Sequence, residues 1–267
     1  MHRPPLDAAE LRRSIAESPD LSFFSRIDVV ESTGSTNADL VARAADPQAD
    51  RHVLIAEAQD RARGRHDRAW SSPPRAQIAM SMLVRLRDID PEALGWLPLL
   101  TGVAVVDAVR DTAGVNANLK WPNDVLVDGR KLAGILAEVA AVGDMPAVVI
   151  GIGLNVSLTQ DELPVPHATS LTLAGASEVD RTALVQSLLR EFARHFTAWQ
   201  SANWDVRVLV EEYRERCTTL GAQVRAELPG GELLTGTATD IDETGRLLID
   251  GRPVSAGDVT HLRPLSQ

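Results

Sequence analysis

The residues best suited to chemistry lie close together near the middle of the chain. Residues 120–124 read Lys-Trp-Pro-Asn-Asp, and Lys131 follows at the start of an apolar run. The segment therefore combines two lysines, an amide and a carboxylate. Lysine is seldom fully buried unless it is paired with an opposite charge. A lysine that enters an apolar segment needs a reason, and a negatively charged ligand is one.

The elements that carry these residues read as a pair of strands. Within residues 125–139, apolar residues flank a tight-turn signal at Asp128-Gly129. The alternation of Lys131, Ala133 and Ile135 predicts that all three lie on one face of the return strand. A lysine there could stabilise negative charge that develops during a reaction. The alternative is an ordinary turn with both lysines on the surface.

Two further polar clusters precede this segment. Ser35-Thr36-Asn37 stands before a helical pattern, where such residues commonly cap a helix, and the same groups also bind polar ligand atoms. The segment 59–70 is polar and contains four arginines, Arg61, Arg63, Arg65 and Arg68. Arginine can bond both oxygens of a phosphate or carboxylate, and a glycine lets backbone N–H groups approach. We interpret this segment as either an anion site or a solvated loop.

Several common catalytic signatures are absent from the sequence. It has no phosphate-binding loop of the Walker type, no Cys/His spacing for a metal and no Gly-x-Ser-x-Gly nucleophile. Gly151 and Gly153 lack the rest of a dinucleotide-binding fingerprint. Alone, they predict a strand at residues 148–156 that is broken at the glycines. No residue is predicted to bind a metal.

The composition is that of an ordinary globular protein. The chain has 267 residues, of which 44% are hydrophobic and 24% charged, enough for one large domain or a large and a small one. A net charge of −10 argues against general binding to nucleic acid or membranes. The single cysteine, Cys217, excludes an internal disulfide, and the N-terminus lacks an apolar signal segment. We predict a soluble, cytoplasmic protein.

The order of predicted elements indicates two domains. Strand patterns occur at residues 26–31, 53–56, 78–86 and 148–156, and helical patterns at 7–15, 36–45, 91–113, 180–199 and 206–216. From residue 221 onward, five short strands within about forty residues favour a small β-barrel. We therefore predict a larger domain of residues 1–217 and a small C-terminal β-barrel domain of residues 218–267.

In order and spacing, the clusters resemble the biotin–protein ligase family, the biotin–[acetyl-CoA-carboxylase] ligases. The matching segments are Ser35-Thr36-Asn37, Glu57-x-Gln59, Arg63-Gly64-Arg65-His66-x-Arg68-x-Trp70, Lys120-Trp121-Pro122-Asn123-Asp124, Lys131-Leu132-Ala133-Gly134-Ile135-Leu136 and Gly151-x-Gly153-x-Asn155. The resemblance implies an α+β fold: a mixed central β-sheet with flanking helices, similar to class II synthetases, followed by an SH3-like β-barrel. The larger domain would then be the catalytic domain that binds biotin and ATP.

The resemblance implies an ATP-dependent ligase with two steps. Biotin and ATP, with Mg²⁺, would first give biotinyl-5′-AMP and pyrophosphate. A lysine of a biotin carboxyl carrier domain, from an acetyl-CoA or acyl-CoA carboxylase or from pyruvate carboxylase, would then take the biotin and release AMP. Neither DNA nor a membrane is expected as a partner. The residues before the first predicted strand are too few for the helix-turn-helix domain of some family members.

The resemblance also implies roles for individual residues. The catalytic residues would be Lys131, Arg65 and Asp124, with Asp124 accepting or orienting the proton of the attacking amine. The biotin-binding residues would be Ser35, Thr36, Asn37, Gln59, Arg63, Gly64, Arg65, Lys131, Gly134, Gly151 and Gly153. The ATP-binding residues would be Arg65, Arg68, Trp70, Asn123, Lys131 and Asn155. Mg²⁺ would be held mainly by phosphates and water.

The arginine loop departs from the family pattern, which usually reads Gly-Arg-Gly-Arg-x-Gly. Ala62 and Asp67 replace the two outer glycines. If either position requires a positive φ, its side chain adds strain of about 1 kcal/mol or more. Because an adenylate must be kept from water, we also expect the loop at residues 60–70 to be partly disordered until a ligand binds.

Two other functions stay open at this point. A lipoyl or octanoyl transferase shares the fold class, but it would lack the Lys-Trp-Pro-Asn-Asp segment and the arginine loop. A non-catalytic regulator that binds biotin or a nucleotide would be favoured by loss of Lys131 or of the arginine loop. Both features are present in this chain.

Overall fold

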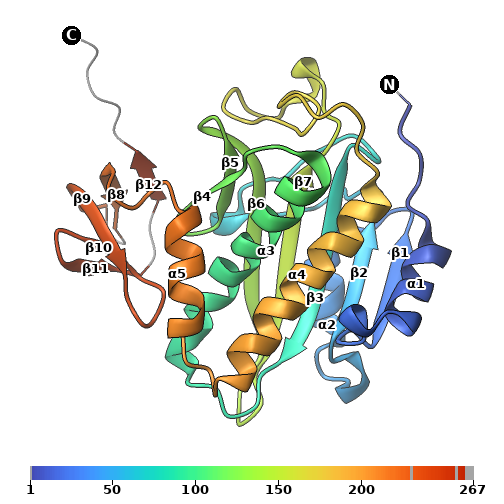
Figure 1. The fold of residues 1–267 in the computed structure, drawn as a ribbon, viewed down its shortest axis with the longest axis horizontal. Helices are drawn as coiled ribbons and strands as arrows, with labels where there is room; N and C mark the ends of the chain where they lie inside the picture. Colours follow the sequence, from blue (N-terminus) through green and yellow to red (C-terminus); the bar gives the residue numbers. More distant parts are fainter. Residues whose placement is uncertain (1, 229–230, 256–257, 262–267) are drawn as a thin grey trace.

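The computed structural model describes residues 2–228, 231–255 and 258–261. Its centre is a mixed seven-stranded β-sheet with the strand order β1-β2-β3-β7-β6-β5-β4 (Figure 1). The strands are β1 (Arg26–Val30), β2 (His52–Ala56), β3 (Gln77–Arg85), β4 (Asn118–Lys120), β5 (Asp124–Val127), β6 (Arg130–Ala141) and β7 (Ala147–Asn155). β1 and β2 are parallel, and the other neighbours are antiparallel. The predicted mixed sheet is confirmed.

Helices cover both faces of this sheet. α3 (Trp96–Ala113) and α4 (Arg181–Ser201) lie over one face, and α2 (Thr36–Arg43) lies on the opposite face (Figure 1). The remaining helices are α1 (Ala8–Glu17) and α5 (Arg207–Arg216), with short 3₁₀ turns at Pro19–Leu21, Pro47–Ala49, Arg65–Asp67, Pro91–Gly95 and Gln160–Glu162. The predicted flanking helices are therefore present.

Three helices begin at polar residues that cap them. The side chains of Asp7, Ser35 and Asp180 accept hydrogen bonds from backbone N–H groups in the first turns of α1, α2 and α4. The helix-capping role predicted as one possibility for Ser35 is therefore confirmed. It fixes the start of α2 against the sheet, so that the next two residues point toward β3 and β6.

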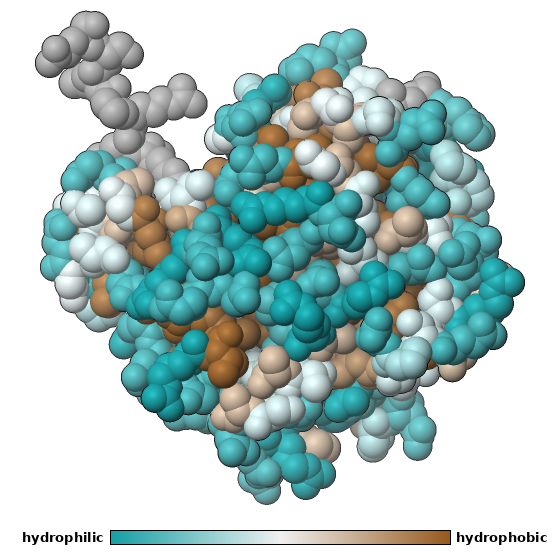
Figure 2. Space-filling view, viewed as in Figure 1, coloured by the Kyte–Doolittle hydropathy of each residue, from teal (hydrophilic) through white to brown (hydrophobic). Residues whose placement is uncertain are grey.

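The apolar segment Pro91–Ala113 belongs to the core. By length and composition it could cross a membrane, but 72% of its most apolar window is buried inside the protein. It packs between the sheet and α4 (Figure 1). On the face shown in Figure 2, hydrophilic side chains predominate, and hydrophobic ones form only small separate patches.

β7 runs without interruption through both of its glycines. Gly151 pairs with Ser81 of β3, and Gly153 pairs with Ala79, with no shift of register between β3 and β7. The prediction that these glycines break the strand was wrong. Their role is to leave space above the sheet.

A register shift changes the face on which Lys131 lies. Between β5 and β6, Val125 pairs with Ala133, but Leu126 pairs with Lys131, so Leu132 is an extra residue on β6. Leu132, like Ala133, is buried in the main core. Lys131 instead lies beside Gly134 on the face that carries α2. The predicted shared face of Lys131, Ala133 and Ile135 was therefore wrong, because a β-bulge interrupts the alternation.

A second, smaller sheet follows α5. Its antiparallel strands are β8 (Gln223–Glu227), β9 (Leu233–Ile241), β10 (Leu247–Ile249), β11 (Arg252–Val254) and β12 (Asp258–His261), in the order β11-β10-β9-β8-β12. The small all-β unit was therefore correctly predicted. The indole N–H groups of Trp96 and Trp121 donate to the carbonyls of Glu243 and Gly245, each at 3.0 Å. These bonds fix the unit beside the Lys-Trp-Pro-Asn-Asp turn.

Candidate active site

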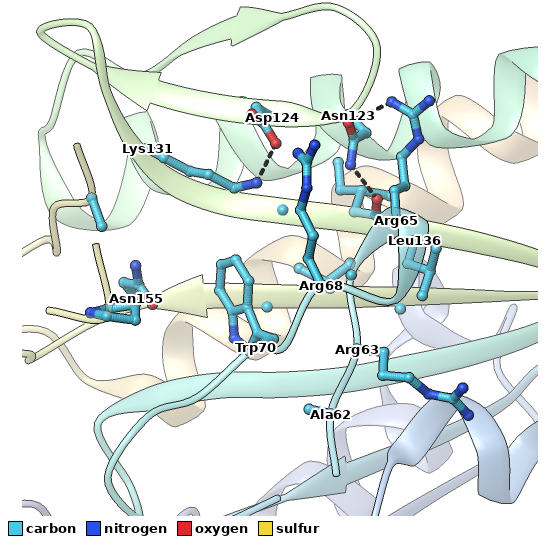
Figure 3. Close-up of a pocket in the computed structure, with 18 of the residues that line it drawn as sticks. Ala62, Arg63, Arg65, Arg68, Trp70, Asn123, Asp124, Lys131, Leu136 and Asn155 are labelled. Carbon is cyan, nitrogen blue, oxygen red and sulfur yellow. Dashed lines mark hydrogen bonds and ion pairs between the residues drawn. The ribbon is translucent and has the colours of Figure 1, made fainter. Parts of the chain in front are cut away.

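A cavity of about 1040 Å³ lies on the face of the sheet that carries α2. Its walls come from the start of α2, the arginine loop, the Lys-Trp-Pro-Asn-Asp turn, the strands β6 and β7, and the segment 164–168. All of the residues predicted to act on biotin or ATP line it, and Figure 3 labels several of them, including Arg65, Asp124 and Lys131. The volume suits a ligand of several rings. The structure thus brings the predicted residues together, while their individual roles stay predictions.

The capped end of α2 forms a hydrogen-bonded corner of the cavity. Gln59 Oε1 accepts from the backbone N–H of Thr36 at 2.7 Å and lies 3.1 Å from its hydroxyl. Asn37 Nδ2 donates to the carbonyl of Leu136 at 3.2 Å and to Glu138 Oε2 at 2.6 Å. These bonds hold each polar side chain in one orientation, as specific recognition of a small ligand requires.

The glycines of β6 and β7 make room for the side chains around them. A Cβ atom on Gly151 would lie less than 3.0 Å from the Asn37 amide, and one on Gly153 would lie 2.6 Å from the Trp70 ring. At Gly134 the same ring would be 3.3 Å away. The indole N–H of Trp70 donates to Gln77 Oε1 at 2.6 Å and so holds the ring against the sheet.

Lys131 and Asp124 form an ion pair at the other end of the cavity (Figure 3). Lys131 Nζ lies 2.5 Å from Asp124 Oδ1, and their side chains are 25% and 20% exposed. This oxygen accepts no well-directed hydrogen bond from the described residues. Lys131 Nζ also lies 5.6 Å from the centre of the Trp70 ring, within the range of a cation–π contact. The lysine charge is therefore held in place beside an aromatic wall.

The arginines of the loop point in different directions. Arg65 Nη1 donates to Asn123 Oδ1 at 3.3 Å, and Asn123 Nδ2 donates to the carbonyl of Ile135 at 2.9 Å. In Figure 3, Arg65 and Arg68 extend toward the strands that carry Asp124 and Lys131, whereas Arg63 points the opposite way. Two of the three predicted anion-binding arginines thus extend toward the side of the cavity that carries Asn123, Asp124 and Lys131 (Figure 3).

The loop itself has a defined path. The backbone N–H of Gly64 donates to the carbonyl of Arg68 at 2.7 Å, and the backbone N–H of Trp70 donates to the carbonyl of Ala62 at 3.0 Å. The expected strain at Ala62 or Asp67 is not found, because the loop residue with positive φ is His66, at 55°. The side chain of Asp67 lies outside the described part of the structure. Disorder of the loop without ligand stays a prediction.

Several functional candidates were missed from sequence. Ser81 and Gln77, both on β3, hold site residues through side-chain hydrogen bonds. The only signal for Ser81 was a lone hydroxyl between Met80 and Met82 in an otherwise apolar strand. The segment 164–168 was also missed. It reaches the cavity because Lys131 N–H donates to the carbonyl of His167 at 2.7 Å.

Asn155 and Glu57 are held by contacts within the protein. Asn155 is 2% exposed, lines the cavity, and donates through Nδ2 to the carbonyl of Thr169 at 3.0 Å. Glu57 is also 2% exposed and forms an ion pair with Arg181 at 2.7 Å. Arg181 in turn donates to the carbonyl of Gln77. Glu57 thus supports the strand ends from which the loop begins, outside the cavity.

One group of side chains elsewhere in the described residues has the spacing of metal ligands. Asp107, Glu191 and His195 lie between α3 and α4. However, Arg216 Nε donates to Asp107 at 2.7 Å, and Arg194 lies 2.7 Å from Glu191. The arginines already supply the positive charge, so the group is an ion-pair network rather than a metal site.

Comparison with known proteins agrees with this geometry. Residues 29–155 match the biotin/lipoate A/B protein ligase family, and residues 219–262 match the biotin protein ligase C-terminal domain. The first match contains the α2 cap, the arginine loop, the Lys-Trp-Pro-Asn-Asp turn and the glycines of β7. The second covers most of the small β-unit.

Individual relatives extend the match to nearly the whole chain. The biotin–[acetyl-CoA-carboxylase] ligase of Mycobacterium tuberculosis is 49% identical over 98% of this chain and 97% of its own length. The bifunctional ligase/repressor BirA of Bacillus subtilis is 33% identical over 84% of this chain and 68% of its own. A biotin protein ligase from Aquifex aeolicus, solved with biotin and ATP, superposes with a TM-score of 0.74 at 25% identity, covering 90% of this chain and all of the other. By sequence, fold and the residues that line its cavity, the chain belongs to the biotin protein ligase family.

Proposed function

We propose that this chain is an ATP-dependent ligase that activates biotin as biotinyl-5′-AMP and transfers it to a lysine of a carrier domain. The observation that carries the proposal is that a capped polar corner, an arginine loop and Lys131 meet in one cavity. One end offers fixed hydrogen-bonding groups for a ring, and the other concentrates positive charge. A carboxylic acid with a polar ring fits both ends.

In the first step the biotin carboxylate attacks the α-phosphorus of ATP. The new bond joins the carboxyl oxygen to phosphorus, the bond from this phosphorus to the bridging oxygen breaks, and pyrophosphate leaves. Both reactants are anions and repel each other. Lys131 and Arg65 reduce this repulsion and stabilise the charge on the pentacoordinate phosphorus, so catalysis is mainly positioning and electrostatics. Arg63 contacts the ligand from the biotin side of the loop.

In the second step a lysine amine of the carrier attacks the carbonyl carbon of biotinyl-AMP. An amide bond forms, the bond to the phosphate oxygen breaks, and AMP leaves. The amine must be neutral to attack and loses a proton as it does so. Asp124 lies at the cavity wall beside Lys131 and accepts or orients that proton.

The remaining lining residues divide between the two substrates. Ser35, Thr36, Asn37, Gln59 and the glycines 64, 134, 151 and 153 form the biotin end, and glycines 134 and 153 also border the Trp70 ring, where the two ends meet. Trp70, Arg68, Asn123 and Asn155 form the nucleotide end, with the Trp70 ring against the adenylate. The described lining holds one carboxylate, Asp124, already paired with Lys131, so the residues do not fit a metal held by protein. ATP enters as its Mg²⁺ complex.

We also assign the wider setting of the reaction. The acceptor is the biotin carboxyl carrier domain of an acetyl-CoA or acyl-CoA carboxylase or of pyruvate carboxylase, and the enzyme works in the cytoplasm. Residues 1–217 form the catalytic domain, and residues 218–267 form the accessory β-domain.

A transfer assay tests the proposal. The protein is incubated with ATP, Mg²⁺, biotin and a carrier domain, and biotin on the carrier is measured for wild type and for Lys131→Ala. We expect transfer by wild type and a loss of at least about 10²-fold in the variant, because the main positive charge at the phosphorus is removed. No transfer by wild type would end the ligase proposal. Transfer of lipoate or octanoate instead would favour the acyltransferase alternative.

A further inference from the structure

Ser81 is a buried hydroxyl that the reaction above does not use. It lies on β3, is 0% exposed, and stands between two methionines. Its Oγ lies 2.7 Å from Thr36 Oγ1 and 2.6 Å from Asn37 Oδ1. Both distances are those of hydrogen bonds, yet a serine has one proton to donate. The direction of each bond therefore follows from the partners.

The Asn37 amide can be oriented without ambiguity. One end lies against the carbonyl of Leu136 and the carboxylate of Glu138, which only accept hydrogen bonds. That end must be the NH₂ group. The opposite end, Oδ1, only accepts, so the proton of the 2.6 Å contact comes from Ser81.

This assignment fixes the hydroxyl of Thr36 as well. Once Ser81 donates to Asn37, the 2.7 Å contact between the two hydroxyls needs its proton from Thr36. Gln59 Oε1 is farther from that hydroxyl, at 3.1 Å, and already accepts the Thr36 backbone N–H at 2.7 Å. The Thr36 proton therefore points to β3, and its lone pairs remain for the cavity.

We propose that Ser81 is a positioning residue that makes the hydroxyl of Thr36 a hydrogen-bond acceptor for a ligand N–H group. This inference rests on the proposed function and deepens it, because the ureido ring of biotin carries such N–H groups. A chain of bonds runs from Thr36 through Ser81 and Asn37 to Glu138. Its fixed direction discriminates against ligands with no N–H at this point, since the acceptor would stay unpaired in a buried site.

The test is a double-mutant cycle on biotin binding, measured by calorimetry with the full chain. Ser81→Ala frees the Thr36 proton to turn into the cavity, where it opposes the ligand N–H. We expect Ser81→Ala and Thr36→Val each to raise the Kd for biotin roughly tenfold or more. The double variant should bind no more weakly than Thr36→Val alone, because Ser81 acts only through that hydroxyl.

Further readouts separate positioning from general stability. In the transfer assay Ser81→Ala should raise the KM for biotin while the KM for ATP and kcat change little. Ser187→Ala removes another buried hydroxyl, on α4 and outside the cavity, and should leave the Kd for biotin unchanged.

The outcomes distinguish this inference from the proposed function. If the unaltered protein does not bind biotin, both fail. If wild type binds biotin but Ser81→Ala binds within twofold of it, the inference alone is overturned. Additive losses in the double variant would also overturn it, because Ser81 would then act independently of Thr36.

Discussion

At the scale of residues, Asp124 and Lys131 are the pair to which the proposed mechanism assigns the central roles. They face each other across the β5–β6 hairpin, and both are largely shielded from water. A shielded charge is costly unless an opposite charge or a ligand accompanies it. In the proposed mechanism, Lys131 gains a second partner when the negatively charged substrates bind, and Asp124 is released toward the incoming amine.

Asp124→Asn should therefore separate the two steps. The amide keeps the shape of the side chain but accepts no proton. We expect the transfer of biotin from preformed biotinyl-AMP to slow by about 10²-fold, the usual size of a general-base contribution. Formation of biotinyl-AMP should change much less. Single-turnover measurements of the two half-reactions provide the comparison.

The hairpin offers a matched control for this variant. Asp128 lies in the β5–β6 turn with a positive φ of 49°, a conformation that asparagine also adopts. Asp128→Asn should leave both half-reactions unchanged. Equal loss of both steps in Asp124→Asn would mean that this carboxylate only holds Lys131.

The identities of most cavity residues could be predicted from sequence, because their types and order are unusual. Their contacts could not. Nothing in the sequence shows that Ser81 meets Thr36 and Asn37, since the three come from different elements. Likewise, Arg63 and Arg65 are neighbours of one glycine, yet their side chains diverge (Figure 3).

At the scale of elements, β7 is the floor of the cavity. Because Gly151 and Gly153 have no side chains, Asn37 and Trp70 occupy the space above them. A methyl at Gly151 must displace the Asn37 amide, and one at Gly153 must displace the Trp70 ring, because both contacts would be shorter than 3.0 Å.

Alanine at these positions should affect different substrates. We expect Gly151→Ala to raise the Kd for biotin about tenfold or more, because the corner at α2 is disturbed. Gly153→Ala should raise the Kd for ATP more than that for biotin, because it displaces the Trp70 ring, which we propose lies against the adenylate. Calorimetry with each substrate measures both. Ile150→Val, in the same strand but buried in the core, should lower stability by about 1 kcal/mol and leave both Kd values unchanged. The reverse preference of the two glycine variants would contradict this assignment.

Strands and helices could be predicted from sequence where their hydrophobic patterns were regular. The errors arose at positions whose orientation or continuity depends on hydrogen bonding with a neighbouring strand. A prediction from alternation assumes that successive residues of a strand point to opposite faces without interruption. The β-bulge in the pairing of β6 with β5 breaks this alternation, so the predicted face of Lys131 was wrong. The glycines of β7 suggested a break, yet β3 and β6 pair with them on both sides, so the strand is continuous.

At the scale of the whole molecule, Asp107 joins three helices. It lies on α3 and contacts His195 of α4 and Arg216 of α5. Burial alone would raise the pKa of Asp107, but hydrogen bonds with His195 and Arg216, together with the arginine charge, lower this pKa below its ordinary value of 3.8. The ionised carboxylate therefore stabilises the folded state.

Asp107→Asn should destabilise the protein by about 2 kcal/mol at pH 7, because Arg216 loses the most buried of its charged partners and keeps the more exposed Glu212 and Glu215. A lowered carboxyl pKa contributes stability above the unfolded pKa, and this contribution is lost as the pH falls through the folded pKa. The difference between wild type and variant should thus shrink below about pH 3.8. Urea unfolding across this range measures it. Asp20→Asn, at an exposed pair 3.8 Å from Arg190, should change stability by less than about 0.5 kcal/mol. A difference that is independent of pH would contradict the ionic explanation.

For the small β-unit, the strands could be predicted from sequence, but the way the unit packs against the larger domain could not. Its turn signals predicted several short strands, and they are present. Its docking could not be predicted, because it depends on indole N–H groups of Trp96 and Trp121 that reach carbonyls far along the chain. Through Trp121 the unit contacts the turn that carries Asn123 and Asp124.

The most direct test of the account is ATP–pyrophosphate exchange measured without any carrier domain. The reverse of the first step incorporates labelled pyrophosphate into ATP only if an acyl-adenylate forms. We predict exchange that depends on biotin and Mg²⁺, that is not supported by lipoate or octanoate, and that is lost in Lys131→Ala. Exchange with lipoate but not biotin, or no exchange with biotin at all, would contradict the formation of biotinyl-AMP in this cavity.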